Sequence, residues 1–189
     1  MPDHTSVSES RAIVLVGFMG AGKSSVGPKL AQLLGWTFKD LDDHIQLQEG
    51  RTVPQIFAES GEAAFRRIEH RALRGLLKEL KESSQVIAVG GGAFAQENNR
   101  ALLESSKVPT VFLDAPPEEL FRRCMEQKID RPLRRDRHQF FQLYEDRRAH
   151  YATATACINT HTKEIEEIAR EVAERLGLKP HLRGVRSTE

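Results

Sequence analysis

Short runs of apolar, often β-branched residues alternate along the chain with longer segments in which apolar positions recur every three or four residues. Runs of the first kind predict buried strands, and segments of the second kind predict amphipathic helices. The predicted strands are Ala12–Val16, 37–39, 86–89, 110–113 and Ala156–Asn159. Because strands and helices alternate, we expect an α/β protein with a parallel sheet built from strand–helix–strand units.

The helical segments differ in how clearly their ends are marked. A helix expected over Lys23–Leu34 contains Pro28, whose missing N–H predicts a local kink or a loosened turn. A capping box predicts that a short helix starts at Thr52, and a longer helix is expected over residues 62–81. The last helix carries a core-facing apolar stripe and is closed by Gly177.

The first predicted strand leads directly into the segment GFMGAGKS, residues 17–24, which fits the phosphate-binding pattern G-x-x-x-x-G-K-[ST]. Glycines allow the backbone N–H groups to approach phosphate, and the helix that follows aims its positive end at the same point. A glycine-rich turn without a nucleotide is the alternative. The residues expected to bind nucleotide here are Gly20, Ala21, Gly22, Lys23, Ser24 and Ser25.

Composition limits the class of ligand and partner. The 189 residues suggest one domain, and a formal net charge of +1 provides no overall field that would attract nucleic acid or a membrane surface. The longest apolar stretch, residues 12–22, is too short to span a bilayer. Two cysteines and seven scattered histidines show no metal-ligand spacing, so we expect neither a disulfide framework nor a structural zinc site. We therefore expect a cytoplasmic protein with a small anionic ligand.

The ends of the chain are polar. Residues 1–10 have no signal-peptide core and predict a disordered N-terminal tail. Residues 11–177 are expected to form a single domain, and residues 178–189 a loose C-terminal tail. No internal repeat or long linker divides the domain.

Acidic residues end two of the predicted strands. Asp40 and Asp42 follow the second strand, where ligands bind in open α/β sheets, so one can hold a metal-bound water and the other a substrate hydroxyl. A helix start is the alternative reading of this pair. Asp114 ends another strand and is an equally good candidate for the residue that holds Mg²⁺, and the sequence alone does not choose between Asp114 and Asp40.

Further candidates lie on a helix and after a strand. Arg66 and Glu69 are three residues apart on the long helix and can form an ion pair, either as ordinary surface charge or as part of a carboxylate-binding site. The triple glycine Gly90-Gly91-Gly92 directly follows a strand and permits close backbone approach to a ligand.

A charged segment and a helix complete the set of candidates. Residues 128–137 are densely charged, with Arg131 near their centre, and suit either a solvated loop or a mobile lid that brings an arginine to a transferring phosphate. On the following helix, Arg147 and Tyr151 are one turn apart, which places a second guanidinium within reach of a substrate.

Taken together, these motifs resemble the shikimate kinase family from residue 13 to about residue 176. The segments that carry the resemblance are, in chain order, 17–24, 40–42, 50–69, 90–92, 131–133 and 147–151. The resemblance implies a three-layer α/β/α P-loop kinase fold, similar to that of nucleoside monophosphate kinases, with a five-stranded parallel sheet in the order 2-3-1-4-5. It also implies a substrate-binding region at about residues 41–69 and a lid at about 128–137.

The implied activity is ATP-dependent, Mg²⁺-assisted phosphorylation of the 3-hydroxyl of shikimate, a step of aromatic amino-acid synthesis. On the nucleotide side, the resemblance assigns Lys23 to phosphate, Ser24 to Mg²⁺, and Asp40 to the metal through water. It places Arg123 against adenine and brings Arg131 from the lid to the phosphates.

On the acceptor side, the resemblance assigns Asp42 to the reacting hydroxyl and makes it the candidate proton acceptor. Arg66 and Arg147 would bind the shikimate carboxylate, and the triple glycine would close over the ring. The residues implied to take part in catalysis are thus Lys23, Asp42 and Arg131. A monomer acting on a small molecule is expected.

Two departures from the family pattern are Pro28, just behind Ser24, and the pair Arg134-Arg135 in the lid. Two other functions remain open from the residues themselves. One is a kinase for a different polyhydroxy acid such as gluconate. The other is a nucleotide-binding regulator without catalysis, which should lack acceptor-site groups such as Asp42 and Arg66.

Overall fold

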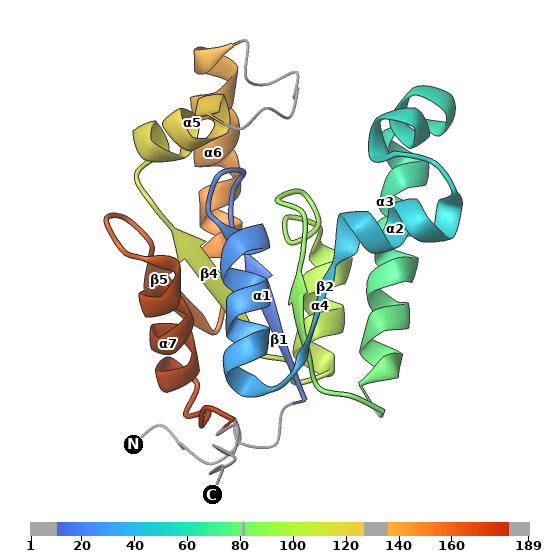
Figure 1. Ribbon diagram of the computed structural model, residues 1–189. Helices are drawn as coiled ribbons and strands as arrows, with labels where there is room; N and C mark the ends of the chain where they lie inside the picture. Colours follow the sequence, from blue (N-terminus) through green and yellow to red (C-terminus); the bar gives the residue numbers. More distant parts are fainter. Residues whose placement is uncertain (1–10, 81, 127–135, 182–189) are drawn as a thin grey trace, which may run out of the picture.

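Five parallel strands form the central sheet of the computed structural model (Figure 1), which describes residues 11–80, 82–126 and 136–181. The strands are β1 (Ala12–Val16), β2 (Thr37–Asp40), β3 (Gln85–Ala88), β4 (Thr110–Asp114) and β5 (Ala156–Asn159). Their order across the sheet is β2-β3-β1-β4-β5, and every neighbouring pair is parallel. The five predicted strands and the expected order are confirmed, with strand ends that differ by at most one residue.

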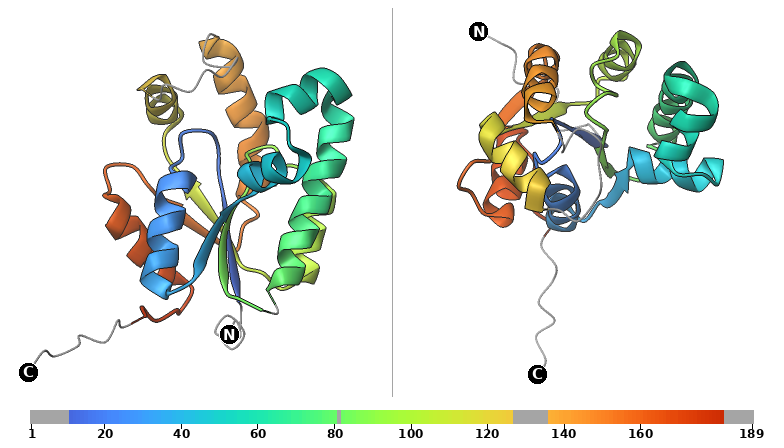
Figure 2. Two further views of the ribbon diagram at one scale, coloured as in Figure 1. Left: turned by 45° about the vertical axis from the view of Figure 1, so that its right-hand side comes forward. Right: turned by 90° about the horizontal axis from the view of Figure 1, so that it is seen from above.

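Helices cover both faces of the sheet and its carboxyl edge. One face is covered by α1 (Lys23–Leu34) and α7 (Ile165–Arg175), and the other by α3 (Val53–Glu79), α4 (Glu97–Ser105) and α6 (Arg137–Tyr151), as the view from above in Figure 2 shows. Two further helices, α2 (Leu41–Glu49) and α5 (Pro117–Glu126), follow the carboxyl ends of β2 and β4. The three-layer α/β/α architecture is therefore confirmed.

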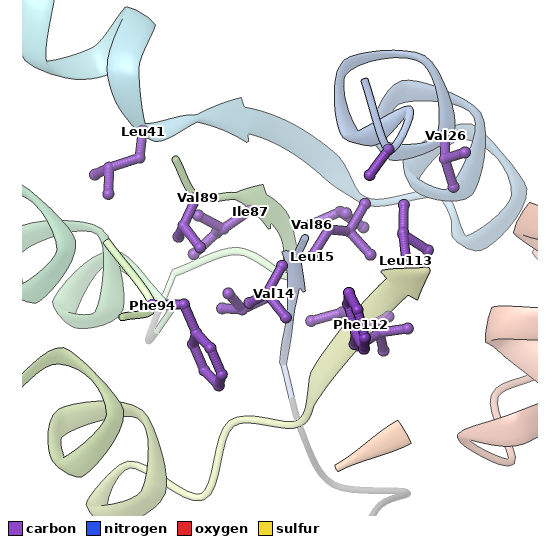
Figure 3. Packing of buried hydrophobic residues seen from close by; sticks show 14 of the residues in the cluster. Val14, Leu15, Val26, Leu41, Val86, Ile87, Val89, Phe94, Phe112 and Leu113 are labelled. Atoms are coloured by element: carbon purple, nitrogen blue, oxygen red, sulfur yellow. The ribbon is translucent and has the colours of Figure 1, made fainter. Parts of the chain in front are cut away.

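The core lies where the central strands meet both helical layers. All five residues of β1 have no exposed surface, because β1 has a strand on each side and helices on each face. Successive residues point to opposite faces. Val14 thus lies on the side of Phe94 and Phe112, and Leu15 on the side of Val26 (Figure 3). Burial on both faces is the reason that β1 is a continuous apolar run.

Several helices differ from the sequence-based expectation. The predicted short and long helices are joined in α3, and the break between them survives at Gly61, whose φ of 76° and ψ of 170° are not helical. Pro28 stays inside α1, which continues through it as one helix. The helix α2 was foreseen only as an alternative reading of the Asp40 segment, and α4 was not predicted at all.

Residues at the end of the expected lid and at the start of the expected C-terminal tail belong to ordered parts of the structure. Asp136 and Arg137, placed in the lid by the sequence, respectively cap and begin α6. After Gly177 the chain turns back, because Leu178 packs against the core and the His181 N–H donates to the Leu33 carbonyl at 2.8 Å. No helix in the described part of the chain is long and apolar enough to cross a membrane.

Candidate active site

The phosphate-binding segment forms a loop between β1 and α1. Gly20 and Gly22 have φ of 81° and 94°, in the left-handed region that glycine adopts without strain. A Cβ on Gly20 would lie 2.6 Å from the Leu120 carbonyl oxygen, so a side chain there is excluded by space as well. The Lys23 ammonium returns over its own loop and donates to the carbonyl oxygens of Gly17 (2.7 Å) and Phe18 (3.1 Å). The loop therefore presents a cation and a helix N-terminus at one point.

A cleft of about 210 Å³ opens beside this loop at the carboxyl edge of the sheet. It brings together residues that are more than one hundred positions apart in the sequence. Its lining residues are Met19, Gly20, Gly22, Lys23, Ser24, Ser25, Asp40, Asp42, Val89, Gly90, Gly91 and Arg147. Most of the predicted site residues are thus in one place.

Asp40 is both the cap of a helix and part of the cleft. Its Oδ1 accepts from the Asp42 N–H at 3.0 Å, so the helix-start reading of this segment is correct alongside the functional one. Burial raises the pKa of Asp40, although the Asp42 N–H opposes the effect. The carboxylate of Asp40 and the hydroxyl of Ser24 line the same cleft, and both are oxygen ligands of the kind that Mg²⁺ prefers.

Asp114, the other candidate, is held elsewhere. Its Oδ1 accepts from the Tyr144 hydroxyl at 3.3 Å, and its Oδ2 accepts from Arg148 Nη2 at 3.2 Å. These three residues line a separate hollow beyond the ends of β4 and β5. Of the two acidic strand ends, the structure therefore places Asp40 beside Lys23 in the cleft.

Arg66 is fixed by two carboxylates on its own helix. Its Nη1 donates to both oxygens of Glu69, at 2.9 and 3.1 Å, which confirms the predicted ion pair, and its Nε and Nη2 donate to Glu62. Glu69 is 1% exposed, and burial raises its pKa even though Arg66 opposes the effect. The guanidinium is thereby aimed rather than free to sample solvent.

Each glycine of the triple glycine lies against a different side chain. A Cβ added to Gly90 would be 3.2 Å from Asp42 Oδ1, and one on Gly92 would be 2.6 Å from Arg66 Nη2. A Cβ on Gly91 would be 3.3 Å from Arg147 Nη1. Side chains of this chain therefore leave little room for a Cβ at the three positions, with the Tyr151 hydroxyl nearest to Gly91 at 2.9 Å. The close approach to a ligand that the sequence predicted stays a prediction.

Tyr151 and the start of α4 hold this glycine segment in place. The buried Tyr151 hydroxyl donates to the Gly91 carbonyl at 2.7 Å, and burial raises its pKa to about 12, so it remains a donor. Asn99 Nδ2 donates to the Ala93 carbonyl at 2.9 Å, and its Oδ1 lies 2.7 Å from His70 Nδ1. Sequence reasoning missed Asn99 and His70, because their contacts join helices 29 residues apart.

Arg123 lies beside the phosphate loop but does not line the cleft. Its guanidinium donates to Glu119 and to the Thr160 carbonyl, and approaches the Gly20 carbonyl at 3.5 Å. It lines a second hollow of about 300 Å³ that shares the phosphate loop with the cleft. Adenine stacking by Arg123 stays a prediction. Arg131 and most of the expected lid lie outside the described residues.

Comparison with known proteins identifies the family. The family model described as shikimate kinase matches residues 19–177. This chain belongs to the shikimate kinase family. Shikimate kinase of Persephonella marina is 39% identical over 167 residues, covering 88% of this chain and 99% of the relative.

Solved shikimate kinases share the architecture. The enzyme from Bacteroides thetaiotaomicron superposes with a TM-score of 0.80 at 33% identity, over 88% of this chain and 98% of that one. The enzyme from Acinetobacter baumannii, solved in complex with shikimate, superposes with a TM-score of 0.79 at 33% identity, over 91% and 96%. The family resemblance expected from the motifs is therefore confirmed.

Proposed function

We propose that this chain transfers the γ-phosphoryl group of ATP to the 3-hydroxyl of shikimate. The observation that carries the proposal is the cleft itself, which Asp42 and Arg147 line together with the phosphate loop and the triple glycine, with Arg66 against Gly92. A carboxylate substrate needs guanidinium groups, and a reacting hydroxyl needs an acceptor close to the phosphates. The shikimate complex of a family member with the same architecture supports this assignment.

On the nucleotide side, the chain supplies charge and position. Lys23 and the amides of its loop would bind the phosphates, and the second hollow beside Arg123 would take the base. Ser24, directly, and Asp40, through water, would hold Mg²⁺, which when bound neutralises charge on the phosphates. Arg131 is proposed to reach the transferring phosphate, as the family resemblance implies.

On the acceptor side, Asp42 would orient the 3-hydroxyl and accept its proton as the new O–P bond forms. Its Oδ1 lies 3.2 Å from the point that a Cβ on Gly90 would occupy, so the carboxylate packs closely against the triple glycine in the cleft. Arg66 and Arg147 would bind the substrate carboxylate from two different helices. The reaction then depends on positioning two substrates in line, which can lower the activation free energy by several kcal/mol.

The other two functions fit less well. A regulator without catalysis should lack acceptor groups, whereas Asp42, Arg66 and Arg147 converge on one segment. A gluconate kinase would use similar groups, but family membership over residues 19–177 favours shikimate. We also propose that the chain works as a monomer in the cytoplasm, as its composition and the family resemblance lead us to expect.

The deciding experiment measures ADP release in a coupled assay with shikimate, gluconate and a nucleoside monophosphate side by side, with and without Mg²⁺. We expect turnover with shikimate and Mg²⁺, at least about a hundredfold faster than with the other acceptors. An enzyme that releases ADP with gluconate but not with shikimate would overturn the proposal. Analytical ultracentrifugation at the protein concentration of the assay tests whether the chain is a monomer.

A further inference from the structure

Three side chains form a closed set of hydrogen bonds between the end of β4 and α6. The Tyr144 hydroxyl donates to Asp114 Oδ1 at 3.3 Å, and Arg148 Nη2 donates to Asp114 Oδ2 at 3.2 Å. Arg148 Nε also donates to the Tyr144 hydroxyl at 3.1 Å. We call Asp114, Tyr144 and Arg148 the β4–α6 bridge. None of the three lines the cleft or the hollow beside Arg123.

The bridge is anchored on the strand side and on the phosphate loop. The Asp114 carbonyl accepts from the N–H (2.7 Å) and the hydroxyl (3.1 Å) of Thr160, which fixes the end of β4 against the segment after β5. The ring of Tyr144 is buried and packs edge-on against Phe18 of the phosphate loop, with ring centres 5.5 Å apart. One turn of α6 therefore contacts both the end of β4 and the phosphate loop.

The same face of α6 carries the acceptor-site residues. Positions 144, 147, 148 and 151 recur at spacings of three and four, so they share one side of the helix. The Tyr151 hydroxyl donates to the Gly91 carbonyl at 2.7 Å, which attaches the end of α6 to the triple glycine. Arg147 directly precedes Arg148 of the bridge, one turn before Tyr151, and it lines the cleft.

We propose that Asp114 is a positioning residue, which acts through Tyr144 and Arg148 to set the rotation of α6 and thereby aims the Arg147 guanidinium at the substrate carboxylate. The bridge and the Tyr151 hydrogen bond attach α6 at two points and so restrict its rotation about its own axis. With only one of these attachments, the helix could rotate about the other. A long side chain such as that of Arg147 magnifies a small rotation at its tip. This inference rests on the proposed role of Arg147 in binding shikimate.

The test is a double-mutant cycle between Asp114→Ala and Arg147→Ala, in which KM for shikimate, KM for ATP and kcat are measured for each variant. We expect Asp114→Ala to raise the KM for shikimate about tenfold and to change the KM for ATP less than about twofold. In the Arg147→Ala background, Asp114→Ala should change the KM for shikimate very little, because the residue through which it acts has been removed.

Arg148→Gln is a second variant that changes a half-exposed side chain and therefore threatens folding less; a KM raised about threefold is expected. Lys29→Ala is the control, because Lys29 is a similarly exposed cation that forms an ion pair with Glu166 between α1 and α7, away from the cleft. Its KM values should equal those of the unmodified chain. Thermal midpoints report the folding of every variant.

The possible outcomes separate this inference from the proposed function. Effects of Asp114→Ala and Arg147→Ala that multiply in the double variant would overturn the positioning role of Asp114. A KM raised by Arg147→Ala but unchanged by Asp114→Ala and by Arg148→Gln would overturn the bridge alone. A KM unchanged by Arg147→Ala would overturn both the bridge and the proposed role of Arg147.

Discussion

The two ends of the cleft are built in different ways. The nucleotide end is one continuous segment, residues 17–24, in which backbone groups and Lys23 come from a single turn between β1 and α1. The acceptor end is assembled from side chains on α2, α3 and α6, which meet around the triple glycine after β3. A local motif tolerates changes elsewhere in the chain, whereas an assembled site depends on how distant elements are held.

The largest effect on activity is expected from a substitution at the nucleotide end. Lys23→Ala removes the cation that lies over the phosphate loop, so we expect kcat to fall by about 10²- to 10³-fold, as for other single groups that stabilise transition-state charge. Binding of shikimate, measured by calorimetry, should change little because the acceptor end is separate. Lys29→Ala on the same helix is the control and should keep full activity. Loss of shikimate binding in Lys23→Ala would show that the two ends are not independent.

The next effect breaks the acceptor end directly. Arg66→Ala removes one guanidinium of the proposed carboxylate site, so we expect the KM for shikimate to rise by about a hundredfold while ATP binding is retained. Because this change also leaves Glu69 buried without its ion pair, Arg66→Lys should be measured beside it. A loss of ATP binding in both variants would contradict the assignment of Arg66 to the acceptor.

A smaller effect disturbs the acceptor end from the backbone. Gly92→Ala adds a Cβ that would lie 2.6 Å from Arg66 Nη2, so the guanidinium must shift, and we expect the KM for shikimate to rise about tenfold. Gly75→Ala in α3 is the matched control, since a Cβ there meets nothing within 4 Å. That change should keep activity and stabilise the helix by roughly 0.5–1 kcal/mol. Equal kinetics for the two variants would exclude close approach as the reason for Gly92.

The smallest effect lies at the edge of the nucleotide end and concerns pH. Hydrogen bonds from Arg122 and Arg123 lower the pKa of Glu119 to about 2, from an ordinary value of 4.5. A lowered pKa stabilises the fold above the unfolded value, and this contribution is lost as pH falls from about 4.5 toward 2. Glu119→Gln should therefore be less stable than the unmodified chain at pH 7 in urea unfolding. The difference should shrink at pH 3 and in high salt.

Much of the fold follows from apolar periodicity. The central strands β1, β3 and β4 were predictable because buried parallel strands are short, largely apolar runs bounded by polar or glycine residues. The edge strands β2 and β5 are only partly buried and mix apolar with polar residues, so their signal in the sequence is weaker. The helix α4 was not, because its nine residues bury the polar Asn99 and have little apolar pattern. The hydrogen bond from Asn99 to the Ala93 carbonyl exists only in the folded chain, so the sequence did not reveal the role of Asn99.

The acceptor residues were predictable as candidates but not as a site. Arg66 and Glu69 are close enough in sequence to pair on one helix, and they do. Arg147 lies more than fifty residues from the triple glycine, so only the crossover connections of the sheet bring it to Gly91. Before the structure, only the family resemblance placed Arg147 and the triple glycine in one substrate site.

The phosphate loop could be predicted from eight consecutive residues, since its conformation depends on glycines within them that adopt left-handed φ. The choice between Asp40 and Asp114, in contrast, depends on contacts between distant parts of the folded chain. Both residues end a strand at the same edge, and β4 is even the direct neighbour of β1. Asp114 is held away from the cleft because Tyr144 and Arg148, some thirty positions later, occupy its carboxylate, whereas Asp40 caps α2 within the cleft.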